Sequence, residues 1–209
     1  MPRSVPAVVR NHLAALRMLL VFTVITGIAY PLAVTGIAQA AFSDKANGSL
    51  VHQNGKVVGS KLLGQNFDLP KKNPDDANEA ARPDPKFFQP RPSAGSYDPL
   101  ASGASNLGPN NADLIKTVKE RKAAVAAFDG VNPKDVPADA VTASGSGLDP
   151  DISKAYAYEQ VNRVAKARGL DPAAVRRLVA DHTDSRSLGF LGQVSVNVLE
   201  LNLALNKTT

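Results

Sequence analysis

The feature that most constrains this chain is a long uncharged stretch near its N-terminus. From Met18 to Ser43 the sequence contains no Asp, Glu, Lys or Arg. A helix over Met18–Phe42 is about 37 Å long, which exceeds the roughly 30 Å hydrocarbon core of a bilayer. We therefore predict one membrane-spanning helix, kinked at Pro31 in a way that membrane helices tolerate.

The charges on either side of this stretch predict its orientation. Arg3, Arg10 and Arg17 precede it without any acidic residue, whereas the first charge after it is Asp44. Basic flanking residues favour the cytoplasmic side of a membrane. The expected parts are a basic cytoplasmic N-terminus, a transmembrane helix and an outer-face domain, at residues 1–17, 18–42 and 43–209.

A cleaved signal peptide is the alternative interpretation of the same stretch. Ala38-Gln39-Ala40 has the small-residue spacing of a cleavage site, although the apolar stretch before it is longer than a usual signal core. Cleavage would release a free-standing envelope binding module. The two interpretations differ in whether the mature chain begins at Ala41.

The charge balance argues against a nucleic-acid partner. The chain has 24 Lys and Arg against 19 Asp and Glu, and three of the excess basic residues lie before the uncharged stretch. Nucleic-acid-binding domains gather basic charge on one face, because affinity comes from phosphate neutralisation. The absence of cysteine also excludes disulfides, thiolate zinc sites and thiol nucleophiles.

The outer domain is expected to be α+β, with a long Pro-rich loop. Asn54-Gly55 between two short β-prone runs predicts a hairpin, since both turn positions require positive φ. Between residues 68 and 110, frequent prolines predict an extended segment on the surface, without regular elements. These prolines stand at positions 70, 74, 83, 85, 90, 92, 99 and 109.

Helix signals dominate the rest of the chain. Asn111 is suited to cap a helix that ends near Gly130. Ser153 is suited to cap a second helix, which ends at Gly169, and Asp171 with Pro172 is suited to begin a third. We expect a strand at Val136–Ala143, and a helix rather than a strand at Val194–Leu205. Solvated helix faces are expected for a set of basic residues, namely Arg163, Lys166, Arg168, Arg176 and Arg177.

No catalytic or metal-ligating residue is predicted. The three histidines, His12, His52 and His182, lie far apart in sequence, and no Gly-x-Ser-x-Gly nucleophile motif occurs. No His, Asp and Glu set repeats with the spacing of metal ligands.

Two loops rich in Ser and Gly are weak candidates for binding an anionic cofactor. Successive glycines allow backbone N–H groups to form an anion nest, yet Asp149 and Asp151 follow closely and repel phosphate. We therefore favour a plain strand-to-helix loop. The candidate residues are Ser102, Gly103, Ser105, Asn106, Ser144, Gly145, Ser146 and Gly147.

The segment Phe67–Asn111 is the expected interface with a protein partner. Its prolines fix φ in advance and reduce the entropy lost on docking, and Arg91 stands stiffly between Pro90 and Pro92. The candidate partner contacts are Gln65, Phe67, Arg91, Asn106 and Asp149.

An ordered series of sequence blocks resembles one known family, the C subunits of the bacterial Kdp potassium-transporting ATPase (KdpC). The chain departs from the sequence pattern of this family at two places. It has Ala104 where the family usually has glycine, and it has a polar insertion at Lys71–Pro85. The most characteristic blocks lie at residues 59–67, 91–94, 102–107, 141–149 and 196–205.

The resemblance implies a non-catalytic subunit of a four-subunit pump in the bacterial inner membrane. Its implied partners are a channel-like potassium-binding subunit, a P-type subunit that binds ATP and Mg²⁺ and hydrolyses ATP, and a small single-helix subunit. It implies a periplasmic domain that assists assembly and raises the affinity of the P-type subunit for ATP. Because ATP is cytoplasmic, we favour the assembly role over direct nucleotide binding by this domain.

Overall fold

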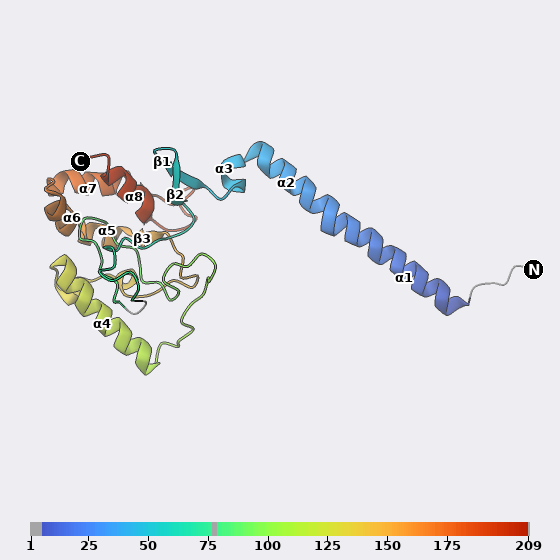
Figure 1. Cartoon of the computed structure of the whole chain (residues 1–209), viewed down its shortest axis with the longest axis horizontal. Helices are drawn as coiled ribbons and strands as arrows, with labels where there is room; N and C mark the ends of the chain where they lie inside the picture. Colours follow the sequence, from blue (N-terminus) through green and yellow to red (C-terminus); the bar gives the residue numbers. More distant parts are fainter. Residues whose placement is uncertain (1–5, 77–78, 209) are drawn as a thin grey trace, which may run out of the picture. The chain divides into compact units, whose positions relative to one another are not determined.

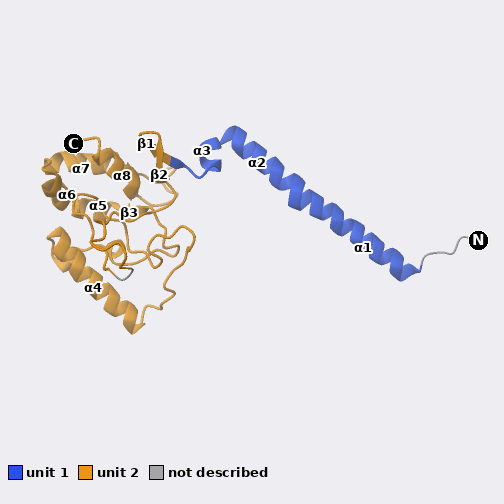
Figure 2. Cartoon of the chain, in the orientation of Figure 1, with its two compact units in different colours: residues 1–50 blue, residues 51–209 orange. Residues whose placement is uncertain are grey.

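The computed structural model describes residues 6–76 and 79–208, and the chain divides into two compact units. Figure 2 colours them separately: Met1–Leu50 carries a long helix, and Val51–Thr209 forms a domain of helices and small sheets. The second unit agrees with the predicted α+β class.

The first unit consists almost entirely of one apolar helix (Figure 1). It comprises α1 (Ala7–Val24), a π-helical stretch η1 (Ile25–Ala29) and α2 (Tyr30–Ala41). Pro31 explains the wide turn before it, because proline lacks a backbone N–H and crowds the carbonyl one turn earlier. By length and composition the helix is able to cross a membrane, and it begins well before the predicted span.

A short helix, α3 (Ser43–Ala46), leads into a two-stranded hairpin. Its strands are β1 (Leu50–Gln53) and β2 (Lys56–Ser60). The turn residues Asn54 and Gly55 have φ angles of 52° and 76°. Both are positive, so the predicted Asn-Gly hairpin is confirmed.

The remaining strands form a three-stranded antiparallel sheet in the order β3-β5-β4. They are β3 (Asp151–Ser153), β5 (Ser195–Asn197) and β4 (Thr183–Asp184). Ile152 and Val196 stand opposite each other across the central pair, and both are buried. The sheet therefore contributes its apolar positions to the core.

Five α-helices lie in the described part of this domain, and three of their N-caps are those that the sequence predicts. The helices are α4 (Ala112–Asp129), α5 (Lys154–Glu159), α6 (Val161–Arg168), α7 (Pro172–Asp181) and α8 (Val198–Leu205). The predicted caps Asn111, Ser153 and Asp171 each accept a bond from a backbone N–H of the first turn. Gly130 and Gly169 end α4 and α6 with left-handed φ, as predicted.

The core is aliphatic and lies mainly between α6, α7, α8 and the sheet. Its most deeply buried apolar side chains include Val161, Val164, Val175, Val179, Val196, Leu201 and Leu205. Leu201 and Leu205 both come from α8, four residues apart on one helix face. The spacing of apolar residues in the last helix therefore fixes which of its faces turns inward.

Three predicted elements differ from the observed ones. The single helix expected from Ser153 to Gly169 is observed as two helices, α5 and α6, separated at Gln160. The expected strand at Val136–Ala143 is wrong: the 3₁₀ turn η3 (Ala138–Ala140) lies within this region, and another, η2 (Pro133–Asp135), ends directly before it. Local bonds from the N–H groups of Ala140 and Val141 to carbonyls three residues earlier replace strand pairing there. In Val194–Leu205, the helix covers only Val198–Leu205 and follows strand β5.

The Pro-rich segment between β2 and α4 has no helix or strand among its described residues, but it is not confined to the surface. Phe88 is fully buried, and Gln89 and Tyr97 are also buried. The expectation of a surface segment is wrong for these positions. The middle of the segment passes through the domain, where its backbone groups need hydrogen-bond partners.

Side-chain amides supply those partners in place of a neighbouring strand. Asn202 of α8 accepts a bond from the Phe88 N–H and donates to the Phe88 carbonyl, both at 2.9 Å. Gln160 accepts from the Gln89 N–H at 2.6 Å and donates to the Gln89 carbonyl at 3.1 Å. We call this arrangement the amide clamp. It allows residues without secondary structure to be buried without unpaired backbone groups.

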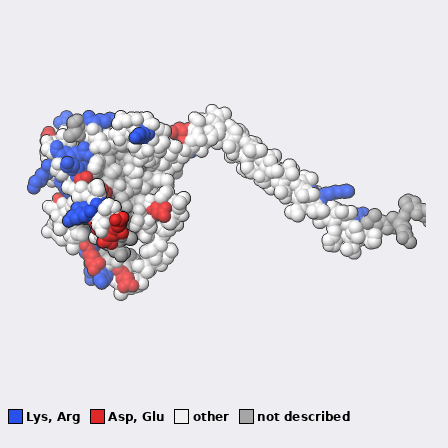
Figure 3. Space-filling model, viewed as in Figure 1, with Lys and Arg blue, Asp and Glu red and all other residues white. Residues whose placement is uncertain are grey.

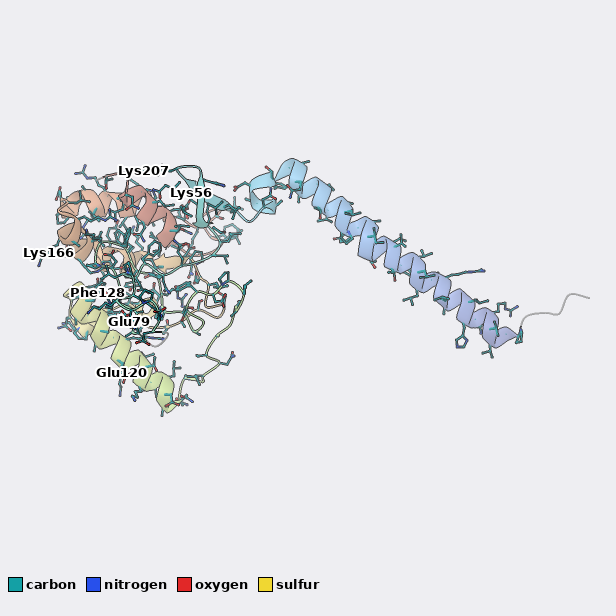
Figure 4. All side chains as sticks on the ribbon, in the orientation of Figure 1. Lys56, Glu79, Glu120, Phe128, Lys166 and Lys207 are labelled. Carbon is teal, nitrogen blue, oxygen red and sulfur yellow. The ribbon has the colours of Figure 1, made fainter. Side chains whose placement is uncertain are left out.

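Arg163 of α6 reinforces the amide clamp from a buried position. Its guanidinium bonds Asp129 at 2.6 Å and donates to the carbonyls of Pro85 and Phe87 at 2.8 and 2.9 Å. It also lies 4.4 Å from the ring centre of Phe128, at the end of α4 (Figure 4). The expectation that Arg163 belongs to a solvated helix face is therefore wrong.

Of the other basic residues of that set, Arg168 departs from the expectation, because it is half-buried and donates to the Lys86 carbonyl at 2.6 Å and to Asn206 Oδ1 at 2.8 Å. Lys166, Arg176 and Arg177 are exposed. Lys and Arg atoms gather at the end of the domain that carries α6 and α7 (Figure 3).

A carboxyl group beside the buried ion pair predicts a pH-dependent stability. Burial, together with the nearby charges of Asp129, Asp139 and Asp135, raises the pKa of Glu159 to about 7. A raised pKa in the folded state means that folding favours the protonated form, so this contribution to stability is lost as pH rises through about 7. Because glutamine does not ionise, we expect Glu159→Gln to reduce the loss of folding stability that occurs as pH rises.

The measurement is the urea midpoint of the full chain in detergent at pH 5 and pH 8. Glu159→Gln is expected to narrow the difference between the two midpoints relative to wild type. Glu120→Gln, at an exposed position on α4 (Figure 4), is the control and leaves the difference unchanged. An identical pH dependence in wild type and Glu159→Gln would contradict the raised pKa.

Candidate functional site

The structure brings together the two Ser and Gly loops that the sequence singles out. The hydroxyl of Ser102 donates to the Ser146 carbonyl at 3.1 Å, and the Gly103 N–H donates to the same oxygen at 2.8 Å. With Leu62, Leu63 and Arg91, residues of these loops line a shallow recess of about 650 Å³. We call this recess and its walls the loop cluster.

Arg91 and Asp149 form an ion pair in the loop cluster. Arg91 Nη1 lies 2.8 Å from Asp149 Oδ2, and the guanidinium also donates to the Thr142 carbonyl. The hydroxyl of Tyr97 donates to the Arg91 carbonyl. The side chains of Arg91 and Asp149 remain 21% and 28% exposed, so both are partly accessible at the surface.

Two glycines allow the loops to approach closely. A Cβ on Gly64 would clash with the Tyr97 ring and lie 2.6 Å from the Asp149 carbonyl oxygen. Gly147 has a φ of 68°, and a Cβ there would lie 2.8 Å from the Gly103 carbonyl oxygen. The loop cluster is therefore packed backbone against backbone, which only glycine permits at these positions.

Two backbone N–H donors at the candidate anion nest are bonded within the chain. Ser144 Oγ accepts from the Gly147 N–H at 2.9 Å, and Ser146 Oγ accepts from the Leu148 N–H at 3.1 Å. Asp149 adds a carboxylate beside them. A phosphate group would have to displace these bonds and approach a negative charge, so the arrangement suits contact with a protein chain better than binding of a phosphate.

The remaining candidate residues lie elsewhere. Ser105 and Asn106 are exposed further along their loop, where Asn106 has a φ of 53° and bonds only the Ala104 carbonyl among the described contacts. Gln65 lies against Gly59 of β2, and Phe67 packs against the Phe87 ring at 5.7 Å between ring centres. Of the five candidate partner contacts, only Arg91 and Asp149 are thus brought together.

Sequence patterns missed an apolar cavity beside α4. Its volume is about 400 Å³, and its walls include Pro90, Pro92, Val125, Phe128 and Tyr156. Burial raises the pKa of the Tyr156 hydroxyl above its ordinary value, which keeps this phenol neutral. Pro90 and Pro92 were the only sequence feature that pointed to this cavity, and no sequence pattern indicates that they lie against α4.

The described residues contain no group of three or more His, Asp and Glu side chains placed to hold a metal ion. A further cavity of about 340 Å³ has walls that include the titratable side chains of His52, Asp181, His182, Asp184 and Glu200.

Comparison with known proteins gives one consistent family. The family model described as "K+-transporting ATPase, c chain" matches residues 12–207. A Streptomyces avermitilis protein named potassium-transporting ATPase KdpC subunit is 53% identical over 220 residues, covering 99% of this chain and 98% of the relative.

Two further relatives carry the same printed name. One from Kineococcus radiotolerans is 52% identical and covers 94% of this chain and 93% of its own length. One from Mycobacterium tuberculosis is 51% identical, with coverages of 95% and 98%.

Proposed function

The chain belongs to the KdpC family, the c chains of K+-transporting ATPases, and we propose that it acts as an accessory subunit of an ATP-driven potassium uptake complex. The match over residues 12–207 carries this proposal, because it takes in the apolar helix as well as the folded domain. In this proposal K⁺ is the transported ion, and the P-type partner subunit binds ATP and Mg²⁺. This chain itself is non-catalytic.

The proposed location is the bacterial inner membrane, crossed once, with the N-terminus in the cytoplasm and the domain in the periplasm. Arg10 and Arg17 on the first part of the long helix support this orientation. Residues 42–50 separate this helix from the second unit and span at most roughly 30 Å when fully extended. The domain therefore works close to the outer surface of the membrane.

In this position we propose that the domain docks on the channel-like potassium-binding subunit and stabilises its assembly with the P-type and single-helix subunits. Prolines and the internal Arg91–Asp149 pair hold the loop cluster in one shape, which lowers the entropy lost on docking. The partly exposed Arg91 and Asp149 are the proposed polar contacts.

A higher affinity of the P-type subunit for ATP then follows from assembly rather than from nucleotide held by this chain. The occupied N–H donors of the Ser144–Gly147 loop support this choice. So does the carboxylate of Asp149 beside them.

The deciding experiment is purification of the tagged full-length chain from detergent after expression with the other subunits. We expect the P-type subunit to be retained, and its KM for ATP to be several-fold lower than in a preparation that lacks this chain. A tagged, unrelated single-span protein controls for nonspecific retention. A soluble product that begins at Ala41 and retains no ATPase subunit would instead support the envelope binding module.

A further inference from the structure

A loop between β4 and β5 exposes a group of large apolar side chains. We call residues 185–194 the apolar loop. Leu188 is 83% exposed, Phe190 69%, Leu191 50% and Val194 41%. Together they present on the order of 400 Å² of apolar surface, the size of the largest patch on a typical monomer, which is often functional.

The loop's own backbone bonds hold it in a defined shape. The N–H of Gly189 donates to the Arg186 carbonyl at 3.1 Å, and the N–H of Leu191 donates to the Ser187 carbonyl at 2.9 Å. Leu188 has a φ of 54°, in the left-handed region that a branched side chain rarely adopts. The turn thus holds Leu188 outward in a strained conformation, and such strain tends to accumulate where it serves function.

A preformed shape and a low charge favour a protein as the occupant. A fluid lipid surface accepts apolar side chains in many arrangements and gains nothing from a strained, fixed turn. Loops that bind lipid surfaces also combine apolar side chains with several basic residues, whereas Arg186 is the one charged residue of this loop. In contrast, a preformed loop loses less entropy when it binds an apolar recess of complementary shape, and so binds it more tightly.

The loop also leaves the domain at a defined place. It begins directly after Asp184, and Asp184 lines the same cavity as Val51, His52 and Gln53 of β1. These residues of β1 are the first of the second unit, where the chain arrives from the long helix. The apolar loop therefore emerges beside the tethered end of the domain, within reach of other membrane subunits of the same complex.

We propose that the apolar loop inserts Leu188 and Phe190 into an apolar recess on the outer face of another subunit of the same ATPase. This inference rests on the proposed function, because it requires the chain to assemble with that complex. A central aromatic side chain surrounded by aliphatic ones is a common form of interface hot spot.

The test is the double variant Leu188→Asn with Phe190→Ser in the tagged full-length chain. Asparagine tolerates left-handed φ better than leucine, so the variant is expected to keep or raise the urea midpoint of the chain alone. Co-purification of the P-type subunit is expected to fall by about tenfold or more. Val57→Thr, at a 54% exposed position on β2 outside the Phe67–Asn111 segment, is the control and changes neither quantity.

The outcomes separate this inference from the proposed function. Retention by the double variant at the wild-type level would overturn the role of the apolar loop and leave the proposed function standing. Failure of the wild-type chain to retain any ATPase subunit would overturn the proposed function itself.

A photo-crosslinking amino acid at position 190 identifies the occupant directly. We expect an adduct with another subunit of the ATPase. An adduct with lipid, an adduct with a second copy of this chain, or no adduct in the intact complex would each contradict the inference.

Discussion

Replacement of Arg163 by methionine is expected to lower the free energy of unfolding of the domain by about 3–5 kcal/mol. The side chains of Arg163 and Asp129 are only 6% and 1% exposed, so the carboxylate of Asp129 would be left buried without its partner. The variant also removes the donors that bond the carbonyls of Pro85 and Phe87. Both losses act on the same segment, which would then depend on the amide clamp and on the hydrogen bonds of the Gln89 side chain and of Arg168.

Urea unfolding of the full chain in detergent measures this effect. The chain has four Tyr and no Trp, and Tyr97 and Tyr156 are buried, so tyrosine fluorescence reports on the domain. Lys166→Met is the matched control, because Lys166 lies on the same helix, α6, and is exposed (Figure 4). Equal midpoints for Arg163→Met and Lys166→Met would show that the buried pair is not a major source of stability.

The second large effect is expected from one added methyl group at Gly64. In Gly64→Ala the new Cβ clashes with the Tyr97 ring and lies 2.6 Å from the Asp149 carbonyl oxygen. A backbone oxygen cannot rotate away as a flexible side chain does, so the loops must separate. We expect a loss of about 3 kcal/mol in the free energy of unfolding.

Gly145→Ala provides the control within the same loop cluster, since no atom lies within 4 Å of a Cβ at that position. Both variants are compared by urea unfolding and by retention of the P-type subunit during purification. Gly64→Ala is expected to lose both stability and retention, whereas Gly145→Ala is expected to keep its stability. A Gly64→Ala chain as stable as wild type would show that the loops tolerate separation, contrary to the packing described above.

Local signals predicted the parts of this fold that depend on neighbouring residues. Asn54 and Gly55 form the expected turn, and Asn111, Ser153 and Asp171 cap the expected helices. In each case the residue type and its immediate neighbours determine the backbone geometry. The uncharged stretch likewise predicted a long apolar helix.

Contacts between distant residues were not predictable in the same way. Gln160 bonds a backbone 71 residues away, and Asn202 one 114 residues away, although both amides resemble ordinary polar helix positions. Arg163 belongs to the same helix as Lys166, and only tertiary packing decides that one is buried and the other exposed. The contact of Ser102 with Ser146 in the candidate site likewise joins loops that are 44 residues apart in the sequence.

The amide clamp sets an order of events during synthesis. Phe88 obtains its hydrogen-bond partner from Asn202, which lies in the last helix of the chain. The ribosome synthesises Phe88 long before Asn202. Most of the domain is therefore translated while the backbone of Phe88 lacks its hydrogen-bond partner. A nascent chain that stalls before α8 is synthesised therefore exposes the segment around Phe88 to proteases. The segment becomes protected only after α8 has been made.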